Sequence, residues 1–206
     1  MNIFLNRKIV SLLMPMLFFA TSALAVDISE YGDFSSRSLI INNQKNNLTQ
    51  EQKDILLLRK LAPTTQCLIQ QIKKNNIENV EFLLDIGLDP NRNYSTEYPI
   101  YIAAKENHFE MVKLLHEKGA KLDRGFYSEL YEALKNKNNE MAQYLLDNKA
   151  NIKYIDSVSQ NTLLYLALKN NMLEIAQQLI AKGANVDRKS VLIIKKKKLL
   201  YLINQN

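Results

Sequence analysis

The sequence predicts an all-α solenoid of about four copies of one helix-turn-helix unit, with a helical cap at each end. Two observations predict this fold. A glutamate followed nine residues later by a turn residue occurs four times, at intervals of 32, 30 and 34 residues, and each glutamate is followed after five residues by a leucine. Each copy also holds two short segments with apolar residues at helical spacing, too short to bury their apolar faces unless successive pairs stack. The glutamates are Glu78, Glu110, Glu140 and Glu174, and the leucines are Leu83, Leu115, Leu145 and Leu179.

Residues 1–25 have the three parts of a secretory signal peptide. Arg7 and Lys8 form a positive start, residues 9–20 are apolar, and Ala23-Leu24-Ala25 is a small-x-small cleavage site. A spanning helix needs about 20 apolar residues, so we expect cleavage after Ala25 and a periplasmic or secreted protein. An uncleaved anchor is the alternative. Residues 26–48 are polar and predict a mobile arm.

The folded part is expected to begin with a capping helix within residues 49–64. Thr49 followed by Gln50-Glu51-Gln52 is typical of a helix start, and an apolar run then precedes Pro63. Four repeats follow at residues 65–97, 98–127, 128–161 and 162–187. Residues 188–206 are basic with apolar stretches, which predicts either a truncated fifth first helix that caps the stack or a frayed tail.

The first helices are expected to end at residues suited to left-handed backbone, with Lys137 the exception, and the second helices at turn residues. Glycine and asparagine adopt that conformation most readily, and they occupy six of the eight positions. The first helices should end before Asn75, Asn107, Lys137 and Asn171, and the second helices before Gly87, Gly119, Lys149 and Gly183.

The second copy resembles the ankyrin repeat motif almost position by position. Residues 98–120 read YPIYIAAKENHFEMVKLLHEKGA, against the motif TPLHxAAxxGHxEVVxLLLxxGA. The resemblance covers about residues 62–190 and implies an ankyrin repeat solenoid that binds a partner through a concave face of hairpin tips and first helices. Tyr101, Tyr131 and Tyr165 replace the motif histidine, so the Thr–His hydrogen bond typical of the family is absent and we expect modest stability. The fourth copy keeps Thr162, Leu164, Ala167, Glu174 and Gly183-Ala184.

Residues suited to catalysis or metal binding are scarce. His108 falls on a histidine of the motif itself, His116 takes an apolar slot, and neither has zinc-site spacing. Cys67 is the only cysteine, which excludes an intramolecular disulfide and a cysteine-cluster zinc site. The aligned glutamates should lie about 10 Å apart, too far for paired-carboxylate catalysis. We therefore predict no enzyme activity, no cofactor and no metal.

Candidate partner-binding residues come from the repeat register. The end of each first helix carries a lysine, and the hairpin tips carry basic and aromatic residues. The lysines either form a basic stripe that attracts an acidic protein segment or an anionic surface, or they only complement the helix dipole. The aromatic tips are either interface anchors or pack on the neighbouring hairpin. The lysines are Lys73, Lys105, Lys135 and Lys169, and the tip residues are Arg92, Tyr94, Arg124, Phe126 and Tyr154.

The net charge of +6 comes from the two ends of the chain. Residues 1–25 and 188–206 hold eight basic residues and no acidic one, which leaves 19 basic and 21 acidic residues between them. This distribution argues against nucleic-acid binding. We predict a monomeric, bacterial-type, non-catalytic scaffold or adaptor that binds an unknown protein. The alternatives are weak anionic membrane contact through Lys195, Lys196, Lys197 and Lys198, and an inhibitory or accessory subunit of an exported enzyme.

Overall fold

The computed structural model describes residues 48–197, which all belong to the compact unit Asn46–Asn206. The signal peptide expected over residues 1–25, nearly all of the arm expected over 26–48, and residues 198–206 lie outside the described residues. The predictions made for these segments therefore stay predictions.

The described part of the chain folds into ten α-helices, which confirms the all-α prediction. Within residues 48–197, strand-type pairing is limited to two isolated bridges, Tyr94–Glu97 and Ile155–Thr162. None of the described helices is long and apolar enough to cross a membrane. The helices are α2 (Gln50–Leu58), α3 (Thr65–Lys73), α4 (Ile77–Asp85), α5 (Pro99–Lys105), α6 (Phe109–Glu117), α7 (Glu129–Lys135), α8 (Asn139–Asp147), α9 (Leu163–Lys169), α10 (Leu173–Ala181) and α11 (Arg188–Lys196).

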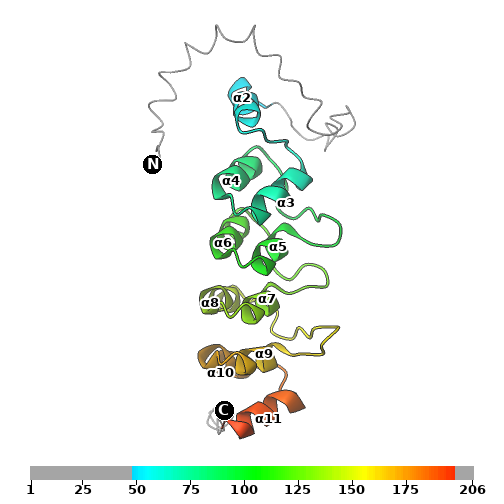
Figure 1. Cartoon of the computed structure of the whole chain (residues 1–206), viewed down its shortest axis with the longest axis vertical. Helices are drawn as coiled ribbons and strands as arrows, with labels where there is room; N and C mark the ends of the chain where they lie inside the picture. The colour runs from blue at the N-terminus through cyan, green and yellow to red at the C-terminus, as the bar shows by residue number, and fades with distance from the viewer. Residues whose placement is uncertain (1–47, 198–206) are drawn as a thin grey trace. The chain divides into compact units, whose positions relative to one another are not determined.

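Each predicted repeat holds one helix pair, and the pairs stack in chain order (Figure 1). We call α3, α5, α7 and α9 the first helices and α4, α6, α8 and α10 the second helices. Each first helix packs on the next one, and α9 packs on α11. One apolar cluster runs through the whole stack from Leu56 to Ile194. Since each helix has only seven or nine residues, burial between neighbouring repeats supplies most of the stabilisation.

All eight predicted turn positions adopt left-handed backbone. At the end of α3, the Asn75 N–H bonds the Ile72 carbonyl and the Asn76 N–H bonds the Gln71 carbonyl, both at 3.0 Å. This pair of bonds is the Schellman motif, which satisfies carbonyls that the helix leaves free. Lys137 and Lys149, at φ 58° and 61°, adopt this conformation without the benefit of glycine.

One backbone carbonyl joins each repeat to the next through a side chain. It belongs to the next-to-last residue of the first helix, and it already accepts the N–H of the left-handed turn residue. A carbonyl oxygen has two lone pairs, and the second lone pair accepts a donor from the following repeat. The pairs are His108 Nδ1 with Ile72 at 3.0 Å, Asn136 Nδ2 with Ala104 at 3.3 Å, Asn170 Nδ2 with Leu134 at 2.7 Å, and Lys197 Nζ with Leu168 at 3.1 Å.

The first of these junctions uses a different register position because of one residue. Glu106 occupies the position of Asn136 and Asn170 in the alignment, and a carboxylate has no proton to donate. His108, two residues further on, supplies the donor instead. Since the Ile72 carbonyl can only accept, His108 Nδ1 carries the proton.

The N-terminal cap covers the stack only in part. Thr49 closes a capping box with Gln52, with bonds of 3.2 and 2.9 Å. The helix ends at Leu58, whereas the apolar pattern extends to Leu61. Arg59 follows the helix and reaches α4, where its guanidinium bonds Asn79 Oδ1 at 3.1 Å. Leu56 and Leu61 are buried, but Leu57 and Leu58 remain exposed.

At the C-terminal end, residues 188–196 form the helix of a fifth repeat rather than a frayed tail. Asp187 caps α11 through the Ser190 N–H at 2.9 Å, and Ser190 and Ile194 are buried. The Lys197 ammonium bonds the end of α9, so it is tied to the stack. Lys195 and Lys196 are exposed, and Lys198 lies outside the described residues.

Replacing Lys149 by glycine should stabilise the fold. A side chain in left-handed backbone costs about 1 kcal/mol, and glycine avoids this cost. We expect Lys149→Gly to raise the free energy of unfolding by about 1 kcal/mol, measured by urea unfolding followed by circular dichroism.

Gly119→Ala is the matched control. Gly119 has φ of 91° at the equivalent turn, and an added Cβ would meet no atom within 4 Å. Its cost is therefore conformational, and we expect a loss of about 1 kcal/mol. Equal stability of Lys149→Gly and the parent chain would contradict this account.

Candidate functional site

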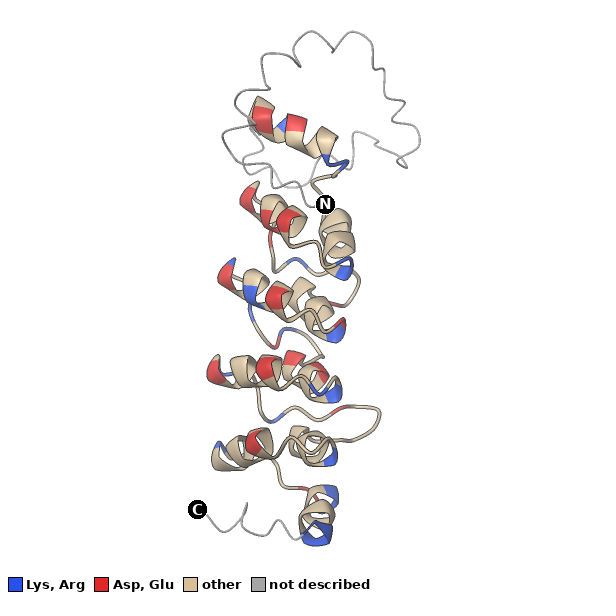
Figure 2. Cartoon of the chain, turned by 60° about the vertical axis from the view of Figure 1, so that its left-hand side comes forward, with Lys and Arg blue, Asp and Glu red and all other residues tan. Residues whose placement is uncertain are grey.

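The lysines predicted from the register form a column along the stack. Each is the last residue of a first helix, and each is exposed. Because successive first helices pack on one another, their equivalent ends lie in line, and basic residues gather at these ends in Figure 2. We call Lys73, Lys105, Lys135 and Lys169 the lysine column.

Two members of the lysine column form ion pairs. Lys105 Nζ lies 2.7 Å from Glu97 Oε1, and this hydrogen bond raises the pKa of the ammonium above its usual value. Lys135 Nζ lies 3.1 Å from Glu132 Oε2. Glu132 is buried, whereas both lysine side chains remain exposed to solvent.

The tyrosines that replace the motif histidine lie beside the lysine column. Tyr101 is buried, stacks on Tyr127 with ring centroids 4.6 Å apart, and donates to Glu132 Oε1 at 3.1 Å. Burial and the neighbouring Glu132 carboxylate raise the pKa of the Tyr101 hydroxyl well above its usual value. The Lys105 and Lys169 ammonium groups lie 5.9 Å from the rings of Tyr101 and Tyr165, within cation–π range.

The hairpin tips differ in how far they are available to a partner. Phe126 is 87% exposed and Tyr94 40% exposed, whereas Tyr154 is half-buried with its ring 5.5 Å from that of Tyr131. Arg92 is exposed, but the Arg124 guanidinium lies 4.9 Å from the Tyr98 ring. Tyr154 and Arg124 are thus engaged within the fold, while the other three predicted tip residues are accessible.

Two further apolar tip residues are accessible, of which Ile155 was expected at a tip from the register and Val158 was not predicted. Val158 is 91% exposed and Ile155 is 44% exposed in the hairpin before α9. A valine between two serines in a polar stretch (residues 156–161) was the available signal. With Tyr94 and Phe126, they place at least one exposed apolar side chain on each of the three hairpins that precede α5, α7 and α9.

Two acids lie close together at the second of these hairpins, the half-buried Asp123 and the buried Glu129. Glu129 is the first residue of α7 and is fully buried, and its Oε2 accepts the Asp123 N–H at 3.0 Å. Asp123 Oδ2 accepts the Asn151 N–H at 2.5 Å, but Asp123 Oδ1 and Glu129 Oε1 have no hydrogen-bond partner. Burial raises the pKa of Glu129 from 4.5 to about 7 and also raises that of Asp123.

Asp123 occupies a hairpin position at which asparagine both donates and accepts a hydrogen bond. In the preceding hairpin, Asn91 donates to the Gly119 carbonyl at 2.8 Å and accepts the Lys121 N–H at 2.9 Å. Ionised Asp123 can only accept, while Lys153, the next equivalent residue, donates to the Gly183 carbonyl. Equivalent backbone groups therefore link successive hairpins. Asn91 bonds both a carbonyl and an N–H group of the next hairpin, whereas Asp123 bonds only the N–H and Lys153 only the carbonyl.

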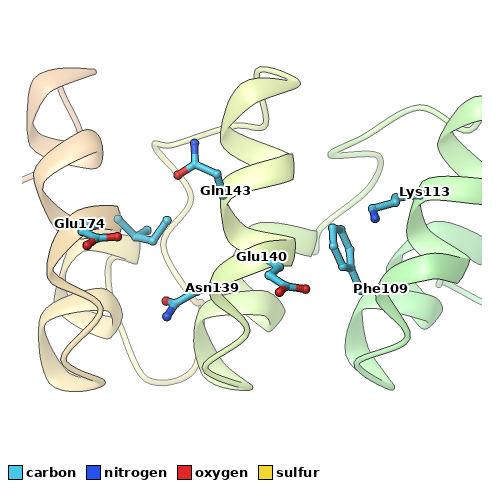
Figure 3. Close-up of a pocket in the computed structure, with 7 residues that line it drawn as sticks. Phe109, Lys113, Asn139, Glu140, Gln143 and Glu174 are labelled. Atoms are coloured by element: carbon cyan, nitrogen blue, oxygen red, sulfur yellow. The ribbon is translucent and has the colours of Figure 1, made fainter.

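The second helices form a separate shallow groove of about 430 Å³. In Figure 3 the carboxylates of Glu140 and Glu174 extend from different helices, with Asn139 and Gln143 nearby. Phe109, Lys113 and Ile175 complete the lining. Sequence reasoning did not predict this groove, because it depends on how neighbouring second helices are spaced.

Both histidines act in packing between repeats. His108 bonds the Ile72 carbonyl, and His116 Nδ1 lies 2.8 Å from the Tyr144 hydroxyl of the next repeat. Within residues 48–197, no group of three or more histidine, cysteine or acidic side chains is arranged to hold a metal ion.

Comparison with known proteins identifies the repeat. A family model described as ankyrin repeats (3 copies) matches residues 28–125, 68–156 and 123–190, which together cover more than half of the chain. The chain belongs to the ankyrin repeat family.

Two known proteins show similarity to these ankyrin repeats. BRCA1-associated RING domain protein 1 of Caenorhabditis elegans is 30% identical over 90 residues, which are 42% of this chain and 13% of that protein. The chain thus spans a small part of that relative. The crystal structure of the human ASB11 ankyrin repeat domain matches with a TM-score of 0.54 and 24% identity, over 65% of this chain and 64% of that one. This second similarity concerns the fold.

The third ankyrin repeat departs from the motif at several positions, and these departures have identifiable consequences. Glu129 stands where the second repeat has Pro99 and the fourth has Leu163, so a carboxyl group occupies an apolar position. Such a group costs free energy when it is charged and buried. A charged residue at an apolar motif position was the signal that could have identified it.

The buried Glu129 should make stability depend on pH. The folded chain keeps this carboxyl protonated up to about pH 7, whereas the unfolded chain ionises it near 4.5. Folding therefore takes up a proton between these values, so stability falls as pH rises from 4.5 towards 7. We expect Glu129→Gln to remove most of this fall, which is on the order of 3 kcal/mol, in urea unfolding measured across that range.

Glu132→Gln provides the control. Glu132 is also buried, but both of its carboxylate oxygens are bonded, to Tyr101 and Lys135. Its replacement should lower stability at pH values above 7 instead of raising it. A parallel pH dependence in the parent chain and Glu129→Gln would contradict the role given to Glu129.

Proposed function

We propose that this ankyrin repeat chain is a non-catalytic adaptor, exported from the cytoplasm, that binds a partner protein through its hairpin tips and first helices. Ankyrin repeats are generally protein–protein interaction modules. The observation that carries the finer proposal is the series of exposed apolar side chains on three successive hairpins, Tyr94, Phe126, Ile155 and Val158.

These side chains have the properties of interface anchors. Exposed apolar residues on successive hairpins provide an extended contact surface, and aromatic anchors contribute strongly to binding. The hairpins project from the side of the first helices in Figure 1, so one partner could contact the tips and the first helices together. This surface extends over three repeats, which suits a partner segment that follows the stack.

The two histidines of the chain have roles within the fold. His108 and His116 are both engaged in hydrogen bonds between repeats. Asp123 is half-buried, and Glu129 is fully buried and thus closed to a substrate.

Export rests on the composition of residues 1–25. The positive start, the apolar stretch of residues 9–20 and the site at Ala23-Leu24-Ala25 support cleavage after Ala25. The mature chain would then act in the periplasm or outside the cell, on a resident protein or on a protein of another cell.

The location of the partner can be tested by site-specific photocrosslinking. A benzophenone amino acid at position 126 or 158 should capture the same protein in intact cells, because both positions lie on exposed tips. Position 117, on the exposed end of α6, is the control and should capture none. Capture of one partner from position 117 alone would place the interface on the second helices and contradict the proposal.

Export is tested separately by N-terminal sequencing of the protein purified from its source cell. The expected first residue is Val26, recovered outside the cytoplasm. A chain that retains residues 1–25 in the membrane fraction would instead identify an uncleaved anchor.

A further inference from the structure

The exposed charges of the two helix sets have opposite signs. On the first helices and α11, every exposed charged residue is basic, and the two acids, Glu129 and Glu132, are buried. The second helices carry exposed acids and a single base, Lys113. Figure 2 shows this separation along the stack. The basic set is Lys73, Lys105, Lys135, Lys169, Arg188, Lys189, Lys195 and Lys196, and the acidic set is Glu78, Glu81, Asp85, Glu110, Glu117, Glu140, Asp147 and Glu174.

The helix dipole accounts for only part of this separation. A dipole favours cations at every helix C-terminus, so lysine should end both helices of a pair. All four first helices do end in lysine, but α4, α6 and α8 end in Asp85, Glu117 and Asp147. Lys118 and Lys182, the C-caps of α6 and α10, also place cations at the ends of these two second helices, so the dipole explains part of the pattern. Within the helices, the sign of the exposed charges follows the face of the stack, and the first helices form the more electropositive face.

The neighbourhood of this surface favours an acidic protein segment over other anions. The hairpins beside the first helices carry the apolar residues Tyr94, Phe126 and Val158. A polypeptide offers carboxylates and apolar side chains together, which complements both the lysine column and these tips.

The spacing of the lysine column suits one backbone conformation. Packed helices lie about 8–10 Å apart, and three residues of polyproline II span about 9 Å and return to the same face. An extended segment in this conformation therefore presents every third side chain to successive repeats. Acid-rich unfolded chains populate this conformation readily.

We propose that the lysine column binds an acidic, extended segment of a partner protein, with a carboxylate at every third residue and apolar side chains directed to the hairpin tips. This proposal rests on the adaptor function and names the chemistry of its partner.

The test uses the full chain and a fluorescent peptide with four Glu-Pro-Leu units, followed by fluorescence anisotropy. The replacement of all four column lysines by glutamine should weaken binding by at least about tenfold, because each lysine meets one carboxylate. Higher salt should weaken binding by the parent chain in the same direction. Circular dichroism melting of each variant confirms that it is folded.

Two matched controls distinguish binding that depends on the spacing of the lysine column from general electrostatic attraction. The variant with Lys113, Lys121, Lys149 and Lys182 replaced by glutamine changes the net charge equally but leaves the column intact. A peptide of identical composition with its four glutamates grouped at one end keeps the charge but loses the spacing. The first control should bind the peptide as the parent chain does, and the grouped peptide should bind several-fold more weakly.

Several outcomes would overturn the proposal. They are no binding of the regular peptide, equal loss in both lysine variants, and equal affinity for the grouped peptide. Dimers in sedimentation that only the column variant loses would instead assign the surface to a second copy of the chain. Binding to phosphatidylglycerol vesicles or duplex DNA through the column, without peptide binding, would assign it to another anion.

The photocrosslinking experiment distinguishes a failure of this proposal from a failure of the adaptor function. If the column variant captures the same partner from position 126 as efficiently as the parent chain, the adaptor stands and the acidic-segment proposal fails. If neither captures a partner while the peptide binds with the expected register, the recognition chemistry stands and the adaptor function fails.

Discussion

The structure depends on burial between repeats, because no single helix pair can be stable alone. Helices of seven or nine residues are too short to persist in water by propensity. The apolar cluster from Leu56 to Ile194 is therefore shared by all the pairs. Every other feature follows from this: the turns must be tight, equivalent residues must line up, and the two ends need covers. Both covers are partial, since α2 leaves Leu57 and Leu58 exposed and α11 leaves Leu192 exposed.

The repeat register was predictable because local rules determine it. Glycine or asparagine marked six of the eight left-handed turns, and a glutamate marked the first turn of each second helix. The same register placed the lysine column at four helix ends. The relations across repeats were not predictable in this way. Whether Glu129 is buried, or Tyr154 packs on Tyr131, depends on residues that are distant in the sequence or belong to a neighbouring repeat. The opposite charges of the two helix sets are a property of surfaces that form only when the repeats stack.

The third repeat shows how this architecture tolerates unfavourable residues. It holds two lysines in left-handed backbone and a buried carboxyl at an apolar position. Each of these costs free energy locally. The repeat still folds, because its apolar residues are buried by neighbours on both sides. Local cost and shared burial thus offset one another, and the exposed ends of the helices remain free to carry charge.

The junction carbonyl has a consequence for how such a chain can evolve. Imidazole, amide and ammonium groups all serve the same acceptor, at His108, Asn136, Asn170 and Lys197. The bond requires a proton donor within reach and little else. Duplication, loss or exchange of a whole repeat therefore creates a new junction that many donor side chains satisfy at once. The length of the stack is open to change by genetic rearrangement, without a matching change on both sides of the break.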